Sequence, residues 1–210
     1  MSQIKYGNQE APEHLDVHFW DERWKTKDTG WDLKTVSPPL KEYFDAFVFK
    51  DKSILIPGCG SAYEAEYLLQ NGYKDITVID ISPTLVQQLL TKFSKYAGKE
   101  LTVICGDFFK HTGTYDFIIE QTFFCALEIH RREEYVAKMQ TLLKEQGKLA
   151  GLLFNKEFEN SPPFGGNKEE YQQLFSSSFE IVQMEPCTTS IGPRLGAELF
   201  FELKNKATFS

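Results

Sequence analysis

Residues 54–69, "ILIPGCGSAYEAEYLL", decide how this chain folds. The apolar run Ile54–Ile56 has the composition of a buried strand, and Pro57 ends it. Gly58 and Gly60 follow, and apolar residues then recur with the spacing of a helix. A strand that passes through a glycine-containing loop into a helix predicts a unit whose backbone closely approaches a nucleotide-like cofactor.

Strand and helix patterns alternate around this unit along the rest of the chain. Strands are expected over residues 53–57, 75–80, 101–106, 115–121, 148–155, 179–185 and 196–203, and helices over 40–47, 62–72, 82–96, 131–147 and 168–177. Such interleaving predicts a mainly parallel sheet with helices on both faces. No helix separates the last two strands, so they are expected to form an antiparallel hairpin at the sheet edge. The pattern resembles the α/β fold of Rossmann-like class I methyltransferases, a seven-stranded sheet with an antiparallel edge strand.

The composition argues against nucleic acid and membrane as partners. The net charge is −7 and the pI about 5.2, and a negative surface repels phosphate backbones. No window approaches ~20 consecutive apolar residues, and the polar N-terminus has no apolar signal segment. The 4 cysteines form no CxxC pair or zinc-like spacing, which favours free thiols and no metal site. We therefore expect a cytoplasmic protein.

The glycine loop itself indicates which cofactor it holds. A dinucleotide-binding loop would carry a third glycine where this chain has Tyr63. That glycine allows the close packing on which a bound pyrophosphate depends. S-adenosylmethionine contains no phosphate, so the shorter loop Gly58-Cys59-Gly60 suits it better than NAD or FAD.

Acidic residues follow the next two strands, at the same expected edge of the sheet. Asp80 lies 22 residues after Gly58, near the ~20 expected for an acid that binds ribose hydroxyls. Asp107 and Phe108 follow the third strand and suit the amino group and ring of adenine. The alternatives are a helix N-terminal charge for Asp80 and a turn residue for Asp107. Together with the loop, these residues predict one adenosine site.

The segments after the fourth and fifth strands are expected to lie beside the acceptor. Phe123 and Phe124 are predicted either to wall a pocket around the sulfonium or to pack in the core. Glu128 and His130 are candidates for acid–base chemistry, Glu128 as a substrate-pocket residue. The alternative for His130 is a helix cap or a surface residue. The stretch "SPPFGG", residues 161–166, is either a stiff turn at the substrate mouth or a simple loop.

Several of these stretches resemble the thiopurine S-methyltransferase family, and within it the thiol and halide methyltransferases of plants and bacteria. They are "FWDERWKTKDTGWD", "LIPGCGSAYEAEYL", "VIDIS", "GDFF", "YDFIIEQTFFCAL" and "PPFGG". The whole match runs from about Phe19 to Phe179. The resemblance implies a single domain over residues 1–210, whose residues 1–50 form a helical cover. It also implies S-adenosylmethionine as the cofactor and a small soft nucleophile as the acceptor.

The resemblance further implies a set of cofactor-binding residues: Trp20, Trp24, Trp31, Gly58, Cys59, Gly60, Asp80, Ile81, Asp107, Phe108 and Gln121. By residue type alone, the three tryptophans predict a core cluster or a partner patch; the family assigns them to a segment folded over the cofactor. Gln121 occupies a position where relatives contact the cofactor with Tyr or Arg.

The chain departs from the family pattern near its C-terminus. Plant halide methyltransferases carry a basic segment where this chain has "SIGPRLGAELFF". Only Arg194 matches, either to steer an anionic nucleophile or as a surface charge of an edge loop. The expected activity is methyl transfer to a thiol, thiopurine, bisulfide, thiocyanate or halide. The alternatives are an O- or N-methyltransferase, an NAD-linked oxidoreductase and a non-catalytic adenosine-binding module. We expect a small-molecule substrate and a monomer, with a dimer as the alternative.

Overall fold

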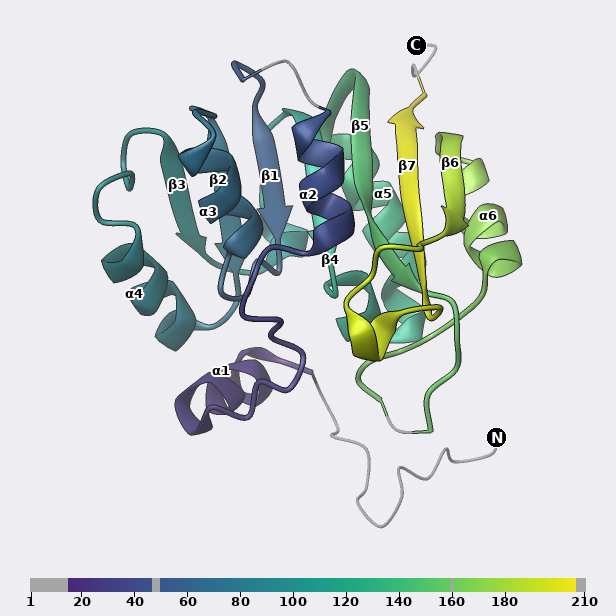
Figure 1. Cartoon of the computed structure of the whole chain (residues 1–210), viewed down its shortest axis with the longest axis horizontal. Helices are drawn as coiled ribbons and strands as arrows, with labels where there is room; N and C mark the ends of the chain where they lie inside the picture. Colours follow the sequence, from purple (N-terminus) through teal and green to yellow (C-terminus); the bar gives the residue numbers. More distant parts are fainter. Residues whose placement is uncertain (1–14, 47–49, 160, 207–210) are drawn as a thin grey trace.

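The computed structural model describes residues 15–46, 50–159 and 161–206, and its centre is a seven-stranded sheet (Figure 1). In chain order the strands are β1 (Ile54–Pro57), β2 (Ile76–Asp80), β3 (Leu101–Cys105), β4 (Tyr115–Gln121), β5 (Leu143–Phe154), β6 (Phe179–Pro186) and β7 (Glu198–Asn205). Their order across the sheet is β3-β2-β1-β4-β5-β7-β6. Strands β1 to β5 are parallel, and β7 is antiparallel to both neighbours. The predicted α/β fold with an antiparallel hairpin is confirmed, and β6 is its outermost strand.

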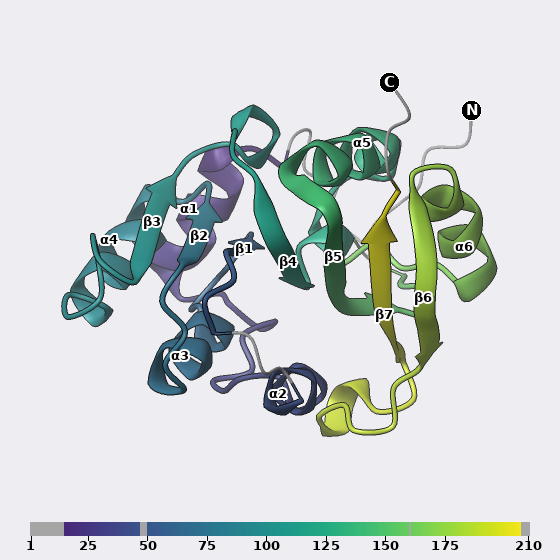
Figure 2. The ribbon, with the colours of Figure 1, turned by 90° about the horizontal axis from the view of Figure 1, so that it is seen from above.

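The helices cover both faces of the sheet, as Figure 2 shows for α2 and α3 against α5 and α6. One face carries α2 (Pro38–Asp45), α3 (Tyr63–Gln70) and α4 (Pro83–Lys92), and the other carries α5 (Arg132–Leu142) and α6 (Lys168–Ser176). Short 3-10 turns are η1 (Phe108–Lys110), η2 (Phe124–Ala126), η3 (Ile129–Arg131) and η4 (Gly192–Arg194). Helix α1 (Val17–Thr26) lies apart, beyond the carboxyl ends of the strands and against α4 (Figure 1).

The apolar run of β1 is continuous because this strand is buried on both faces. Ile54 and Ile56 pack in the cluster under α2, α3 and α4, whereas Leu55 points into the cluster under α5 and α6. Beyond β2, Ser82 caps α4 by accepting the N–H of Leu85 at 3.1 Å, as the sequence predicts. The strand–loop–helix units thereby bring their loops to one edge of the sheet.

The predicted helix 131–147 ends five residues early, which corrects its C-terminal boundary. Leu143 already pairs with Tyr115 of β4, and a register shift follows before the regular ladder resumes. Gln146 adopts a left-handed φ of 63°, and a Cβ on Gly147 would lie 2.9 Å from the carbonyl oxygen of Lys144. The glycine therefore marks an irregular strand start rather than a helix end.

The N-terminal region contributes two different layers. Leu40 and Phe44 of α2 are 0% and 4% exposed and belong to the core cluster with α3, while Phe47 lies outside the described residues. Leu15, α1 and the chain that follows this helix reach the carboxyl edge of the sheet. Among the described residues, no helix has the length and apolarity needed to cross a membrane.

Candidate active site

A pocket of about 480 Å³ lies at the carboxyl ends of the strands, between the loops of the sheet and α1. Its size is typical of small-molecule sites, which occupy roughly 300–1,000 Å³. The predicted site residues that line it are Trp20, Trp24, Trp31, Gly58, Gly60, Asp80, Ile81, Asp107, Phe108, Phe123 and Arg194. The structure therefore brings together residues from six separate stretches of the sequence.

The glycine loop after β1 has a backbone that only glycine adopts without strain. Gly58 and Gly60 have φ values of 54° and 50°. A Cβ on Gly58 would lie 2.2 Å from Cδ2 of Phe123, so the aromatic ring occupies the space beside the loop. The bare backbone at this position lets β1 and the segment after β4 form one continuous pocket wall.

Asp80 ends β2 with its carboxylate at the pocket wall. Its Oδ1 accepts the N–H of Ser82 at 3.0 Å, and its Oδ2 accepts the N–H of Gly60 at 3.3 Å. Burial raises the pKa of Asp80 to about 6, and these N–H groups oppose the shift. The residue thus serves both as an acceptor at the start of α4 and as a carboxylate facing the pocket. A half-buried carboxylate of this kind suits a ligand that presents two hydroxyls.

Asp107 and Phe108 form the next part of the wall, after β3. Asp107 caps η1 by accepting the N–H of Phe109 at 2.9 Å, as in its alternative role as a turn residue, and it also lines the pocket. Phe108 is 4% exposed and meets Phe123 edge-on, with ring centroids 5.1 Å apart. With Ile81 nearby in the lining, this region offers an apolar slot that has an acid at its rim.

The three tryptophans form one cluster over the glycine loop. The Trp31 ring meets Trp20 and Trp24 edge-on, at centroid distances of 5.6 and 6.0 Å. A Cβ on Gly60 would lie 3.8 Å from the Trp24 ring, so this side chain rests against the loop. Trp24 is only 8% exposed, belongs to the core cluster and also lines the pocket.

Another part of the pocket wall is aromatic and includes two cationic side chains, of which Arg131 is paired with Glu134 at 2.9 Å. It is lined by Phe123, Phe154, Phe158, Pro162, Pro163, Arg131 and Lys156. The rings of Phe154 and Phe158 meet edge-on at 4.9 Å, and the Lys156 ammonium lies 4.7 Å from the Phe158 ring centroid. The prolines come from the predicted turn at residues 161–166, which therefore belongs to the pocket rim. Sequence reasoning missed Phe154, Lys156 and Phe158. The available signal is their position, because Phe154 ends β5 and the other two residues follow directly.

Arg194 is buried at the rim rather than exposed on an edge loop, with 8% of its surface accessible. Its guanidinium donates to the carbonyl oxygen of Trp31 at 2.7 Å and contacts the Glu198 carboxylate at 3.4 Å. The Gln121 amide nitrogen donates to Glu64 Oε1 at 3.0 Å, and its amide oxygen accepts a hydrogen bond from the Arg194 guanidinium at 3.2 Å. Gln121 thus lies behind Arg194 and does not line the pocket, because its amide is engaged by these two partners.

Three further predicted site residues lie outside the lining. Cys59 is 8% exposed and packs in the core cluster under α3, so only its backbone belongs to the loop. Phe124 is fully buried and packs edge-on against Tyr135 at 5.0 Å, which favours its core alternative. Glu128 lies 3.6 Å from the exposed His130, away from the pocket, in the arrangement of a surface pair.

Glu120, the penultimate residue of β4, was not predicted and shapes the pocket from beneath. It is 0% exposed and accepts the N–H groups of Phe123 and Phe124 at 3.1 and 3.3 Å. Burial, together with the neighbouring Glu198, raises the pKa of Glu120 to about 8. Its hydrogen bonds hold the turn at Thr122, where φ is 62°, and so direct Phe123 towards Gly58. The sequence feature that could have revealed the role of Glu120 is an acid at the end of the otherwise apolar stretch "FIIE".

Comparison with known proteins fits this arrangement. The family model for "Thiopurine S-methyltransferase (TPMT)" matches residues 15–198, nearly the whole chain. The chain belongs to the thiopurine S-methyltransferase family. The resemblance noted in the sequence is thereby confirmed.

Relatives within the family cover most of the chain. A probable thiol methyltransferase 2 of Arabidopsis thaliana is 30% identical over 195 residues, which cover 90% of this chain and 86% of the relative. A thiopurine S-methyltransferase of Photobacterium profundum is 27% identical over 177 residues, covering 77% and 83%.

A solved structure of Burkholderia thailandensis 1,6-didemethyltoxoflavin-N1-methyltransferase, with bound 1,6-didemethyltoxoflavin and S-adenosylhomocysteine, also matches. Its TM-score is 0.71 at 16% identity, over 95% of this chain and 94% of that one, which shows the shared fold.

Proposed function

We propose that this member of the thiopurine S-methyltransferase family transfers a methyl group from S-adenosylmethionine to a small soft nucleophile. The acceptor classes are a thiol, a thiopurine, bisulfide, thiocyanate or a halide. One observation carries the proposal: a glycine loop and two strand-end acids share a single pocket with an aromatic, positively charged compartment. Family membership supports the reaction class.

The pocket residues fit S-adenosylmethionine, the cofactor of this family. In the proposed arrangement Asp80 accepts the two ribose hydroxyls, and the slot at Asp107 and Phe108 holds the adenine. The bare backbone at Gly58 and Gly60 receives the methionine part, and a side chain at Gly58 would collide with Phe123 in the pocket wall. The tryptophan cluster supports a role as cover, since it rests on the same loop.

The acceptor compartment suits a nucleophile that needs little help to ionise. Bound S-adenosylmethionine supplies an electrophilic methyl group. A free thiol has a pKa of ~8.5, so a useful fraction is already thiolate near neutrality. Lys156 in the lining favours the anionic form, and Phe123, Phe154 and Phe158 exclude water around it. Catalysis then rests on alignment and desolvation instead of a strong general base.

A panel of acceptors tests the proposal. Purified protein is incubated with S-adenosylmethionine and with bisulfide, thiocyanate, iodide, an aromatic thiol, a catechol or an amine, and S-adenosylhomocysteine is quantified. We expect turnover with at least one of the first four and none with the last two. Methylation of only the catechol or the amine would replace the soft-nucleophile assignment by O- or N-methylation.

The affinity for S-adenosylhomocysteine is expected to fall in acid, because ribose hydroxyls donate to the ionised form of Asp80. The pKa of this carboxyl is about 6 in the free protein, so protonation sets in as the pH drops below 7. Below pH 6 the affinity should approach a tenfold loss per pH unit, the limit for one proton. Calorimetry between pH 8 and pH 5 measures this. The Asp80→Asn variant should bind weakly and without that slope; an equal slope in the variant would assign it to another group.

The cysteines and the pocket support proposals for the cellular compartment and the size of the substrate. All four cysteines are free thiols, and three of them are buried, which suits a reducing cytoplasm. The pocket has the size for a small molecule, and we propose a monomer as the active form.

A further inference from the structure

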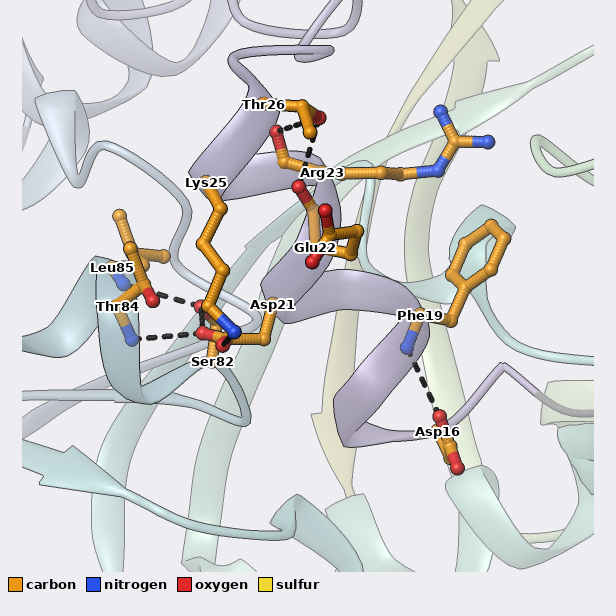
Figure 3. Close-up of polar contacts among 10 residues, drawn as sticks. All are labelled: Asp16, Phe19, Asp21, Glu22, Arg23, Lys25, Thr26, Ser82, Thr84 and Leu85. Atoms are coloured by element: carbon orange, nitrogen blue, oxygen red, sulfur yellow. Dashed lines mark hydrogen bonds and ion pairs between the residues drawn. The ribbon is translucent and has the colours of Figure 1, made fainter.

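Asp21 attaches α1 to the body of the protein, as Figure 3 shows. Its carboxylate lies between the helix and the start of α4 and is 6% exposed. Oδ1 accepts the hydroxyl of Ser82 at 2.6 Å and the N–H of Thr84 at 2.8 Å. Oδ2 pairs with the ammonium of Lys25 at 2.7 Å, one turn along α1. A buried carboxylate is tolerated only where such partners replace its lost hydration.

Ser82 connects this attachment to the pocket. Its hydroxyl donates to Asp21 and accepts the N–H of Leu85 at 3.1 Å, while its own N–H donates to Asp80 Oδ1 at 3.0 Å. A single residue therefore contacts two carboxylates, one on the covering helix and one at the pocket wall. Since Trp20 and Trp24 flank Asp21 in α1, the attachment fixes the side chains that cover the glycine loop.

We propose that Asp21 is a positioning residue that holds α1 across the cofactor site, and that Ser82 couples this attachment to cofactor bound at Asp80. The inference rests on the proposed binding of the ribose at Asp80. Coupling between two sites is reciprocal. Attachment of α1 therefore strengthens cofactor binding by the same factor by which bound cofactor protects α1 from detachment.

The chemistry of the contact favours positioning over simple packing. An apolar side chain would suffice to dock a helix, whereas a carboxylate at the start of α4 meets the positive end of that helix. The contact holds only while both donors of the turn at Ser82 and Thr84 point at it, so it senses the geometry of this turn. The same turn fixes one oxygen of Asp80.

Three variants of α1 test the proposal in the full chain. Asp21→Ala removes the contact, and Asp21→Asn keeps an oxygen acceptor without the charge. Glu22→Gln is the matched control, because Glu22 is the next residue of the same helix, is exposed, and loses the same charge. We expect Asp21→Ala to raise the Kd for S-adenosylhomocysteine about tenfold or more, Asp21→Asn to lie between it and wild type, and Glu22→Gln to change the Kd less than about twofold.

Hydrogen exchange separates positioning from general stability. In the ligand-free Asp21 variants, amides of α1 should exchange faster while those of β1, β4 and β5 stay protected, and the KM for S-adenosylmethionine should rise with little change in kcat. Protection of α1 and a Kd equal to wild type in Asp21→Ala would overturn the proposal. Faster exchange throughout the sheet would reduce Asp21 to a structural role and also overturn it. Failure of the wild type to bind S-adenosylhomocysteine would instead refute the proposed function, and the ligand-free comparison would still test the attachment of α1.

Discussion

Replacing Gly58 by alanine is expected to lower the affinity for S-adenosylhomocysteine by about 100-fold or more. Backbone strain and overpacking together should cost roughly 2–5 kcal/mol of binding free energy. The added Cβ would lie 2.2 Å from Cδ2 of Phe123 at a φ of 54°. Phe123 is held from behind by Glu120, so relief of the clash moves its ring into the pocket. Calorimetric titration measures the affinity. The strain alone, roughly 1–2 kcal/mol, should also lower the melting temperature by about 2–8 °C.

Gly192→Ala is the control for this experiment. A Cβ at Gly192 meets no atom within 4 Å, and its φ is not in the left-handed region. Its effect on affinity and stability should stay within about 0.5 kcal/mol. Unchanged cofactor binding in Gly58→Ala would show that the loop does not receive the cofactor.

Replacing Asp80 by alanine is expected to weaken S-adenosylhomocysteine binding by more than about 100-fold. Each hydrogen bond to a charged acceptor contributes roughly 1.5–3 kcal/mol, and the proposed ribose contact contains two of them. The N–H groups of Gly60 and Ser82 also lose their acceptor, which loosens the loop and the start of α4. Asp80→Asn preserves the shape of the side chain and isolates the loss of charge.

Asp75→Asn provides the matched control, because this exposed acid precedes the same strand, outside the pocket lining. Its affinity should equal that of wild type. If Asp80→Ala bound S-adenosylhomocysteine as tightly as wild type, the adenosine site would have to lie elsewhere in the molecule.

The sequence predicted the parts of the site that follow from strand ends. The carboxyl end of a parallel strand has a fixed place in the sheet, so Gly58, Asp80 and Asp107 were assigned to one edge from spacing alone. The burial of β1 on both faces was likewise readable, because Leu55 and its neighbours are all apolar. The local sequence pattern was sufficient to place a residue wherever the sheet topology alone determines its neighbours.

Contacts between distant segments were beyond the reach of the sequence. Phe123 and Phe124 are adjacent and identical in type, yet one lines the pocket and the other packs against Tyr135. The turn held by Glu120 decides between them, and it depends on a left-handed backbone at a threonine. The burial of Arg194 depends on a carbonyl group of the chain, which no side-chain pattern encodes.

The bond between Arg194 and the Trp31 carbonyl has a consequence for biosynthesis. These residues are 163 positions apart, so the rim cannot close until the chain up to Arg194 has left the ribosome. Nascent chains that stop before β7 also lack Glu198, the carboxylate that faces the guanidinium. We therefore expect nascent chains to bind S-adenosylhomocysteine only once β7 has been synthesised.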